Sequence, residues 1–207
     1  MKGILITFEG TEGCGKSTHL RLLYAYLKKR RKNVFLTREP GGTRTGDAIR
    51  QVLLDVKNEK MSSVTETLLY MASRAQLVSE VLKPKLMKGN IVLCDRWMDS
   101  TVAYQGHAGG VDPAWIETLG KAATQGVVPR LTIFLDLPVK VGLARAKKRH
   151  AADRMEKKKI LFHQKVRQGF LAIAQREPKR FKRILVSASD PIEAVQKKIR
   201  VQVDRVL

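Results

Sequence analysis

The chain has 207 residues, of which 43% are hydrophobic, so we expect one sizeable folded core and exclude a disordered protein. It carries 40 lysines and arginines against 19 aspartates and glutamates, a net charge of +21. No apolar run approaches the roughly 18 residues of a membrane-spanning helix, two cysteines are too few for a disulfide framework, and no signal peptide precedes the first strand-like run, so we expect a cytoplasmic protein.

The N-terminal segment contains the most specific pattern. Residues 3–8 form an apolar strand-like run, and residues 10–17 match G-x-x-x-x-G-K-[ST]. Leu20, Leu23 and Leu27 then follow at helical spacing, so the loop lies between a strand and a helix, as a phosphate-binding loop requires. The pattern predicts a nucleoside triphosphate site, with Lys16 as the cation on the phosphates and Ser17 as a Mg²⁺ ligand.

Short apolar runs and helical patterns alternate along the rest of the chain. The strand-like runs are residues 4–8, 33–37, 91–94, 131–135 and 183–186. Helices are predicted over residues 63–88, where Val64 and Leu68 begin an apolar stripe, and from Asp112-Pro113 and Asp190-Pro191 onward. Asp112 is expected to cap its helix with proline at the first helical position, and Asp190 to cap the last helix with Glu193 completing a capping box. The alternation predicts a single α/β domain over residues 1–207, a three-layer α/β/α fold with a five-stranded parallel sheet.

Polar residues gather where three of these strands end. Residues 10–17, Arg38–Thr43 and Asp95–Gln105 each follow a strand-like run, and the carboxyl ends of parallel strands meet at one edge, where ligands bind. Asp95 is placed to hold Mg²⁺ through its water shell. The neighbouring Arg96 would be a costly charge at a strand end without an anion, and a phosphate monoester suits its planar fork.

Tyr70 and Arg74 are four residues apart and share one helix face. Together they could hold a flat base by stacking and by hydrogen bonding to its edge. The alternative is that Tyr70 is an ordinary core residue and Arg74 forms a surface ion pair.

The combined motifs resemble the thymidylate kinase family of P-loop nucleoside monophosphate kinases. The matching segments run in order over about three quarters of the chain, and the pair Arg38-Glu-Pro-Gly-Gly-Thr43 and Asp95-Arg-x-x-x-Ser-x-x-Ala-Tyr-Gln-Gly106 is the most specific part. The resemblance implies the P-loop NTPase fold and phosphorylation of dTMP to dTDP with ATP and Mg²⁺.

The resemblance also implies roles for individual residues. ATP would be bound by Gly10, Thr11, Glu12, Gly13, Cys14, Gly15, Lys16, Ser17 and Thr18. Substrate dTMP would be bound by Arg38, Pro40, Arg50, Tyr70, Arg74, Arg96, Ser100, Thr101, Tyr104 and Gln105. Arginines 38, 50 and 96 would surround its phosphate, Tyr70 would stack on thymine, Arg74 would donate to O4 and Gln105 would read N3. Pro40 would shape the methyl pocket, and Tyr104 would exclude a 2′-hydroxyl. Alternatively, Ser100 and Thr101 only cap a helix, Pro40 only forms a turn and Arg50 lies on the surface.

The basic segment 145–156 resembles the family's lid. Positions 11–14 of the phosphate loop hold no arginine, and in this family a phosphate-clamping arginine comes from the loop or from the lid. We therefore expect the phosphate-clamping arginine to come from the lid, as in the bacterial type. Arg149 is the first candidate and Arg154 the second. With Lys16, Arg96 and Glu12 they complete the expected catalytic set. Asp153 and Glu156 have the spacing of a capping box that would start the next helix.

Other functions remain open at this stage. Tyr70 and Trp97 depart from the commonest family pattern, so a dUMP or dGMP kinase is an alternative. The net charge of +21 could reflect a surface rich in lysine, positive charge around two nucleotides, or a P-loop ATPase that acts on nucleic acid. We expect no nucleic-acid partner, because the basic residues form no aromatic-interleaved stripe. The family implies a homodimer.

Overall fold

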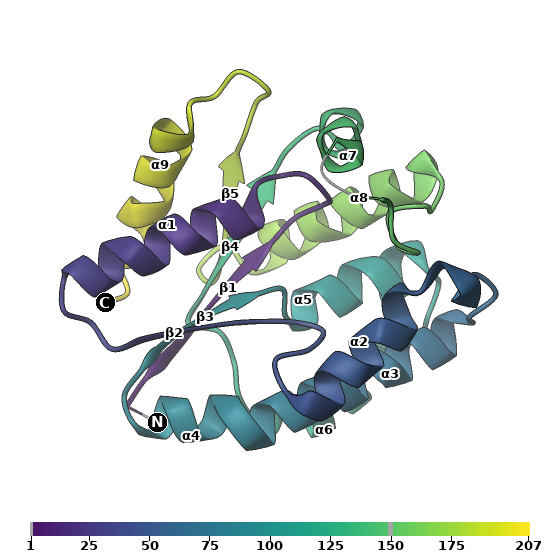
Figure 1. The fold of residues 1–207 in the computed structure, drawn as a ribbon, viewed down its shortest axis with the longest axis horizontal. Helices are drawn as coiled ribbons and strands as arrows, with labels where there is room; N and C mark the ends of the chain where they lie inside the picture. The colour runs from purple at the N-terminus through teal and green to yellow at the C-terminus, as the bar shows by residue number, and fades with distance from the viewer. Residues whose placement is uncertain (1, 149–150) are drawn as a thin grey trace.

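The structure is a computed structural model that describes residues 2–148 and 151–207. Its five strands are all parallel and form one sheet in the order β2-β3-β1-β4-β5 (Figure 1). They are β1 (Ile4–Glu9), β2 (Val34–Arg38), β3 (Ile91–Asp95), β4 (Leu131–Asp136) and β5 (Phe181–Leu185). The predicted parallel α/β/α fold is therefore confirmed, although β5 starts two residues before its expected position.

The early start of β5 has a simple cause. Phe181 is 2% exposed and packs against Phe134 of β4, so it belongs to the sheet. The charged Lys182 and Arg183 interrupt the apolar run in the sequence and hide its beginning.

One face of the sheet is covered by α1 (Lys16–Lys29) and α9 (Ile192–Asp204) (Figure 1). Alternate strand residues point into this layer, among them Ile6 and Phe8 of β1, because successive side chains of a strand point to opposite faces. The leucines predicted on one face of the first helix are buried here, which confirms that face.

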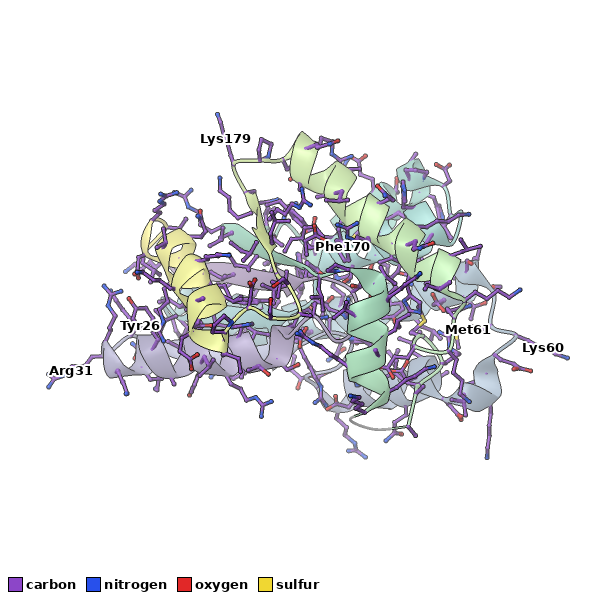
Figure 2. All side chains as sticks on the ribbon, turned by 90° about the horizontal axis from the view of Figure 1, so that it is seen from above. Tyr26, Arg31, Lys60, Met61, Phe170 and Lys179 are labelled. Atoms are coloured by element: carbon purple, nitrogen blue, oxygen red, sulfur yellow. The ribbon has the colours of Figure 1, made fainter. Side chains whose placement is uncertain are left out.

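The opposite face is covered by two groups of helices. The first comprises α3 (Ser63–Leu77), a π-helical turn (Val78–Leu82) and α4 (Lys83–Met87), which pack on Leu5 and Val92. The second is α8 (Ile160–Arg176), whose Phe170 packs on Phe134 and Phe181. The labelled Phe170 lies inside the molecule (Figure 2). The remaining elements are α2 (Arg44–Leu54), a 3₁₀ turn (Val56–Asn58), α5 (Met98–Thr101), a second π-helical stretch (Val102–Ala108), α6 (Pro113–Thr124) and α7 (Val139–Lys147).

Three sequence expectations about helices have different outcomes. Asp112 caps α6 as predicted, because its side chain accepts a hydrogen bond from Ala114 N. Asp190 does not cap α9; its carboxylate accepts from the backbone N–H and hydroxyl of Ser187 instead, and the helix begins at Ile192. The residues at the start of the α3 stripe are exposed, Val64 by 51% and Leu68 by 45%, because the helix buries a neighbouring face.

Basic side chains are spread over the surface. Arg31, Lys60 and Lys179 are exposed and project from three separate edges of the molecule (Figure 2). Within residues 2–148 and 151–207, no helix is both long and apolar enough to cross a bilayer.

Candidate active site

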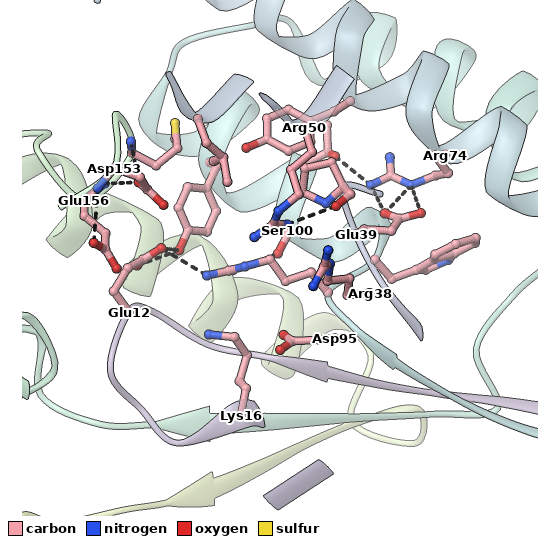
Figure 3. Close-up of a pocket in the computed structure, with 18 of the residues that line it drawn as sticks. Glu12, Lys16, Arg38, Glu39, Arg50, Arg74, Asp95, Ser100, Asp153 and Glu156 are labelled. Atoms are coloured by element: carbon pink, nitrogen blue, oxygen red, sulfur yellow. Dashed lines mark hydrogen bonds and ion pairs between the residues drawn. The ribbon is translucent and has the colours of Figure 1, made fainter. Parts of the chain in front are cut away.

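The phosphate loop turns tightly between β1 and α1. Gly10, Gly13 and Gly15 have φ angles of 143°, 67° and 99°, in the region that favours glycine. A Cβ on Gly13 would lie 2.0 Å from Gly142 O, so the loop also packs closely on α7. Lys16 Nζ donates to Gly10 O at 3.0 Å and to Thr11 O at 3.1 Å, which holds its charge over the loop (Figure 3). This geometry suits a polyphosphate.

Ser17 and Asp95 meet beside the loop. Ser17 Oγ donates to Asp95 Oδ2 at 3.0 Å. Among the described residues, the buried Asp95 Oδ1 has no hydrogen-bond partner, so a carboxylate oxygen is left for a cation. A hydroxyl and a carboxylate next to a phosphate site are the oxygen donors that Mg²⁺ prefers, so the residues present fit this ion.

Arg96 has a left-handed backbone, with φ 72°, which is unfavourable for a side chain with a Cβ. Its guanidinium donates to Gly10 O at 3.2 Å, to Ser100 Oγ at 3.1 Å and to Glu12 Oε1 at 3.0 Å. Its own N–H donates to Phe8 O at 2.9 Å. The loop after β3 is therefore tied to the end of β1, and Arg96 lies directly against the phosphate loop.

Glu9 holds this loop in place, and no sequence pattern points to it apart from its position at a strand end. The carboxylate is fully buried, and it accepts from Trp97 N at 2.7 Å and from Ser100 Oγ at 2.6 Å. Burial, reinforced by Asp99, raises the pKa of Glu9 to about 8, although Arg96 and the two hydrogen bonds oppose this shift. Glu9 thereby holds the segment that directly follows Arg96.

Glu12 is held between several donors. Tyr104 Oη donates to both carboxylate oxygens, at 2.9 and 2.8 Å, and His163 Nδ1 lies 3.7 Å from Oε2. Burial favours the neutral form, but Arg96, His163 and Lys16 outweigh it and lower the pKa of Glu12 to about 2. Glu12 is therefore a fixed negative charge that orients Arg96.

The loop after β2 brings two more arginines to the same place. Arg50 Nη1 donates to Pro40 O at 2.9 Å. Arg38 is exposed, and its Nη2 lies 3.6 Å from Asp47 Oδ1. Burial lowers the pKa of Arg50, and the positive charges of Arg38 and Arg96 lower it further. The repulsion between these cations favours the binding of an anion, because a negative charge between them would offset it.

The two polar side chains that are expected to contact the nucleotide base, Arg74 and Gln105, each bind a buried carboxylate. Arg74 is 1% exposed and forms an ion pair with Glu39, with Nη2 2.6 Å from Oε2, and it also donates to Thr101 Oγ1 at 3.1 Å (Figure 3). Gln105 Nε2 donates to Glu66 Oε1 at 2.7 Å. Sequence analysis missed both carboxylates, although Glu39 lies within the motif that follows β2.

Most of these groups face one cavity of about 350 Å³, whereas Glu9 and Glu66 lie outside its lining. The phosphate loop contributes Glu12, Gly13, Lys16 and Ser17 to the lining. The other described residues that line it are Arg38, Glu39, Pro40, Arg50, Leu54, Tyr70, Arg74, Asp95, Arg96, Trp97, Ser100, Thr101, Tyr104, Gln105, Asp153, Met155 and Glu156. The cavity has the size of a small-molecule site. Gly10, Thr11, Cys14, Gly15 and Thr18 complete the loop behind it without lining the cavity.

The predicted lid is only partly described. Its first residues belong to α7, and Arg145 donates to Ala188 O at 3.0 Å. Arg149, the first choice for the lid cation, lies outside the described residues.

Arg154, the second choice, is buried in this structure, away from the cavity lining. It is 3% exposed and is not one of the described residues that line the cavity. Nη2 lies 2.5 Å from Glu66 Oε2, and Nε donates to Leu53 O at 2.7 Å, so here Arg154 anchors the segment after the lid. The Asp153–Glu156 capping contacts form as predicted, but they close a turn, and the helix begins only at Ile160.

The raised pKa of Glu9 predicts a pH-dependent stability. Between its ordinary value of 4.5 and about 8, the folded protein binds more protons than the unfolded chain, so the free energy of unfolding falls as pH rises. One such group changes it by at most about 1.4 kcal/mol per pH unit. Glu9→Gln, which resembles the protonated form, should flatten this fall, as measured by urea unfolding at several pH values in that range. The exposed Glu193→Gln should keep the wild-type slope, and an unchanged slope in Glu9→Gln would contradict the prediction.

Comparison with known proteins agrees with this geometry. The thymidylate kinase family model matches residues 8–199. A thymidylate kinase of Geotalea uraniireducens (strain Rf4) is 46% identical, with 97% of this chain and 96% of the relative covered. Another from Citrifermentans bemidjiense is 51% identical, with 86% and 82% covered. The crystal structure of thymidylate kinase from Ehrlichia chaffeensis matches with a TM-score of 0.80 and 33% identity, over 97% of this chain and 98% of that one. The chain belongs to the thymidylate kinase family.

Proposed function

We propose that this chain transfers the γ-phosphate of ATP to the 5′-phosphate of dTMP, giving dTDP. The observation that carries the proposal is that two phosphate-binding groups face one cavity: the loop with Lys16, and the three arginines 38, 50 and 96. A site for two phosphates in contact is what a nucleoside monophosphate kinase requires. Family membership supports dTMP as the acceptor.

The donor half consists of the phosphate loop. Residues 10–18 would surround the phosphates of ATP with backbone N–H groups, while Lys16 would supply a point charge. Ser17 would hold Mg²⁺, and Asp95 would hold it through water. When bound, this ion neutralises charge on the phosphate oxygens.

The acceptor half consists of the arginines and the residues around the base. Tyr70 would stack on thymine, and Pro40 would pack at its methyl group. Among the described residues, Arg74 Nη1 donates to the weakly accepting thioether sulfurs of Met71 and Met98, both at 3.3 Å, so it would donate to the stronger acceptor O4. Ser100 and Thr101 would act through Arg96 and Arg74, whose guanidiniums they hold.

The reaction needs charge placement more than proton transfer. An oxygen of the acceptor phosphate already carries negative charge, so it can attack the γ-phosphorus in line without a general base. Arg96 would hold that phosphate, since Glu12 fixes its guanidinium from behind. Tyr104, hydrogen-bonded to Glu12, would lie under the deoxyribose where a 2′-hydroxyl would project.

The donor assignment predicts the effect of Lys16→Met. Removing the cation should abolish phosphoryl transfer while leaving the fold intact, because the hydrogen bonds of Lys16 to the described residues all stay within its own loop. Formation of ADP is measured with ATP and dTMP, dUMP, dGMP, AMP or single-stranded DNA in parallel, and circular dichroism checks folding.

Wild-type enzyme should consume ATP fastest with dTMP. Preference for dUMP or dGMP would identify a different monophosphate kinase, and stimulation by DNA alone would identify a nucleic-acid-dependent ATPase. Wild-type turnover by Lys16→Met would overturn the donor assignment.

The lid assignment predicts a different kinetic effect. We propose that Arg149 contacts the transferring phosphoryl group, because the phosphate loop has no arginine. Arg149→Ala should lower kcat, by a factor on the order of 10³, far more than it raises the KM for dTMP. Steady-state kinetics measure both constants, with Lys179→Ala as an exposed control. Wild-type kcat in Arg149→Ala would rule out this role.

We also propose that the chain forms a homodimer in the cytoplasm. Both cysteines are free and buried, as suits a reducing compartment, which cell fractionation tests. The exposed Val64, Leu68 and Ala72 form an apolar row on α3, and a second copy of the chain is the partner that the family implies. Leu68→Glu should convert the dimer to monomers in sedimentation velocity, whereas Lys60→Glu should not. A monomeric wild-type protein would refute the proposal.

A further inference from the structure

Gln105 occupies an unusual position between the cavity and a buried acid. It is 2% exposed and lines the cavity, and its Nε2 donates to Glu66 Oε1 at 2.7 Å. Among the described residues, its carbonyl oxygen takes part in no hydrogen bond, so Oε1 is the amide atom that remains for a ligand. An amide has one donor end and one acceptor end, so its orientation decides which ligand atoms it can recognise.

Glu66 determines that orientation. Its carboxylate is 5% exposed, and Oε2 lies 2.5 Å from Arg154 Nη2. A carboxylate in an ion pair with a guanidinium can only accept hydrogen bonds, so the end of Gln105 that faces it must be the NH₂ group. Arg154 is itself fixed, since its backbone N–H and Nε donate to Leu54 O and Leu53 O at the end of α2.

These contacts set the direction of the Gln105 amide. Arg154 forms an ion pair with Glu66, Glu66 accepts a hydrogen bond from Gln105, and Gln105 therefore presents an acceptor to the cavity. Arg74, which lines the same cavity and pairs with Glu39, can only donate. The site thus offers one acceptor and one donor to the edge of a base.

We propose that Glu66, held by Arg154, is a specificity-determining positioning residue that makes the site select a pyrimidine with an N3–H donor and an O4 acceptor, and reject cytosine. Cytosine has the opposite polarity at both atoms, with an acceptor at N3 and an amino group at C4. The inference rests on the proposed function, because it takes the ligand to be a pyrimidine nucleoside monophosphate. Thymine and uracil share the selected edge, so Glu66 does not act on the choice between them.

The test is Glu66→Gln. Arg154 can still only donate, so it should bind the oxygen of the new amide and turn its NH₂ group toward Gln105. Gln105 should then reverse and present a donor to the base. Kinetics with ATP give kcat/KM for dTMP and dUMP, and competition against dTMP gives the inhibition constant of dCMP.

The substitution should weaken use of dTMP relative to binding of dCMP by about tenfold or more, because a matched hydrogen bond is replaced by two facing donors. The values for dTMP and dUMP should fall together, so their ratio should stay constant. A merely structural role would weaken all three nucleotides equally, and that result would overturn the inference.

Two further variants make the test specific. Gln105→Met, which removes both the donor and the acceptor of the amide, should on its own lower the preference for dTMP over dCMP. Adding Glu66→Gln to that variant should cause no further loss, and a second full loss would contradict action through Gln105. Glu117→Gln, an exposed acid on α6, is the control that should keep wild-type preference.

The outcome also separates this inference from the proposed function. If the wild-type protein fails to phosphorylate dTMP, the proposed function is wrong. If it phosphorylates dTMP and Glu66→Gln keeps the wild-type preference against dCMP, only the role of Glu66 is refuted.

Discussion

Parallel register at the carboxyl edge of the sheet is the constraint on which the site depends. Asp95 is the Cα partner of Phe8 on one side and of Arg38 on the other. Adjacent strands are only about 4.8 Å apart, so the phosphate loop, Asp95 and Arg38 must lie side by side. A slip of one residue would turn these side chains to the wrong face of the sheet. The order β2-β3-β1 therefore joins the donor and acceptor halves before any ligand is bound.

Buried carboxylates then determine how each functional group points. Glu12 backs Arg96, Glu39 backs Arg74, and Glu66 backs both Arg154 and Gln105. A guanidinium buried without such a partner would be strongly destabilising, whereas a paired one keeps its remaining N–H groups directed at the ligand. Glu9 does the same for the segment that follows Arg96, since it accepts hydrogen bonds from Trp97 N and Ser100 Oγ. Such prearranged dipoles need no reorganisation during phosphoryl transfer.

The sequence could reveal the parts of the site that are local, and it could not reveal the pairing between them. The phosphate loop, the strands and the base-binding helix follow from spacing within short windows. The partners of Arg74 and Arg96 lie 35 and 84 residues away, and Glu9 and Trp97 are 88 residues apart, so no local pattern connects them. Local rules also misled where a competing partner was close: Ser187 takes the carboxylate of Asp190 from the helix end. The apolar row that begins at Val64 predicts a helix correctly, but the row is exposed, because periodicity identifies an apolar face without saying what covers it.

The net charge of the site does not account for the net positive charge of the whole chain. Among residues 2–148 and 151–207, five basic side chains and five acidic ones line the cavity, so this part of the lining is formally neutral, while the chain carries +21. The excess therefore belongs to the rest of the molecule, where basic side chains project in several directions (Figure 2). A neutral lining cannot hold two polyanions through its net field. It has to hold them through individual contacts: Glu12 and Glu39 pair with Arg96 and Arg74, and Glu66, outside the lining, orients Gln105. Affinity and base selectivity in this fold thus depend on the direction of individual hydrogen bonds, and a change that keeps charge but reverses one direction should alter selectivity more than a change of surface charge.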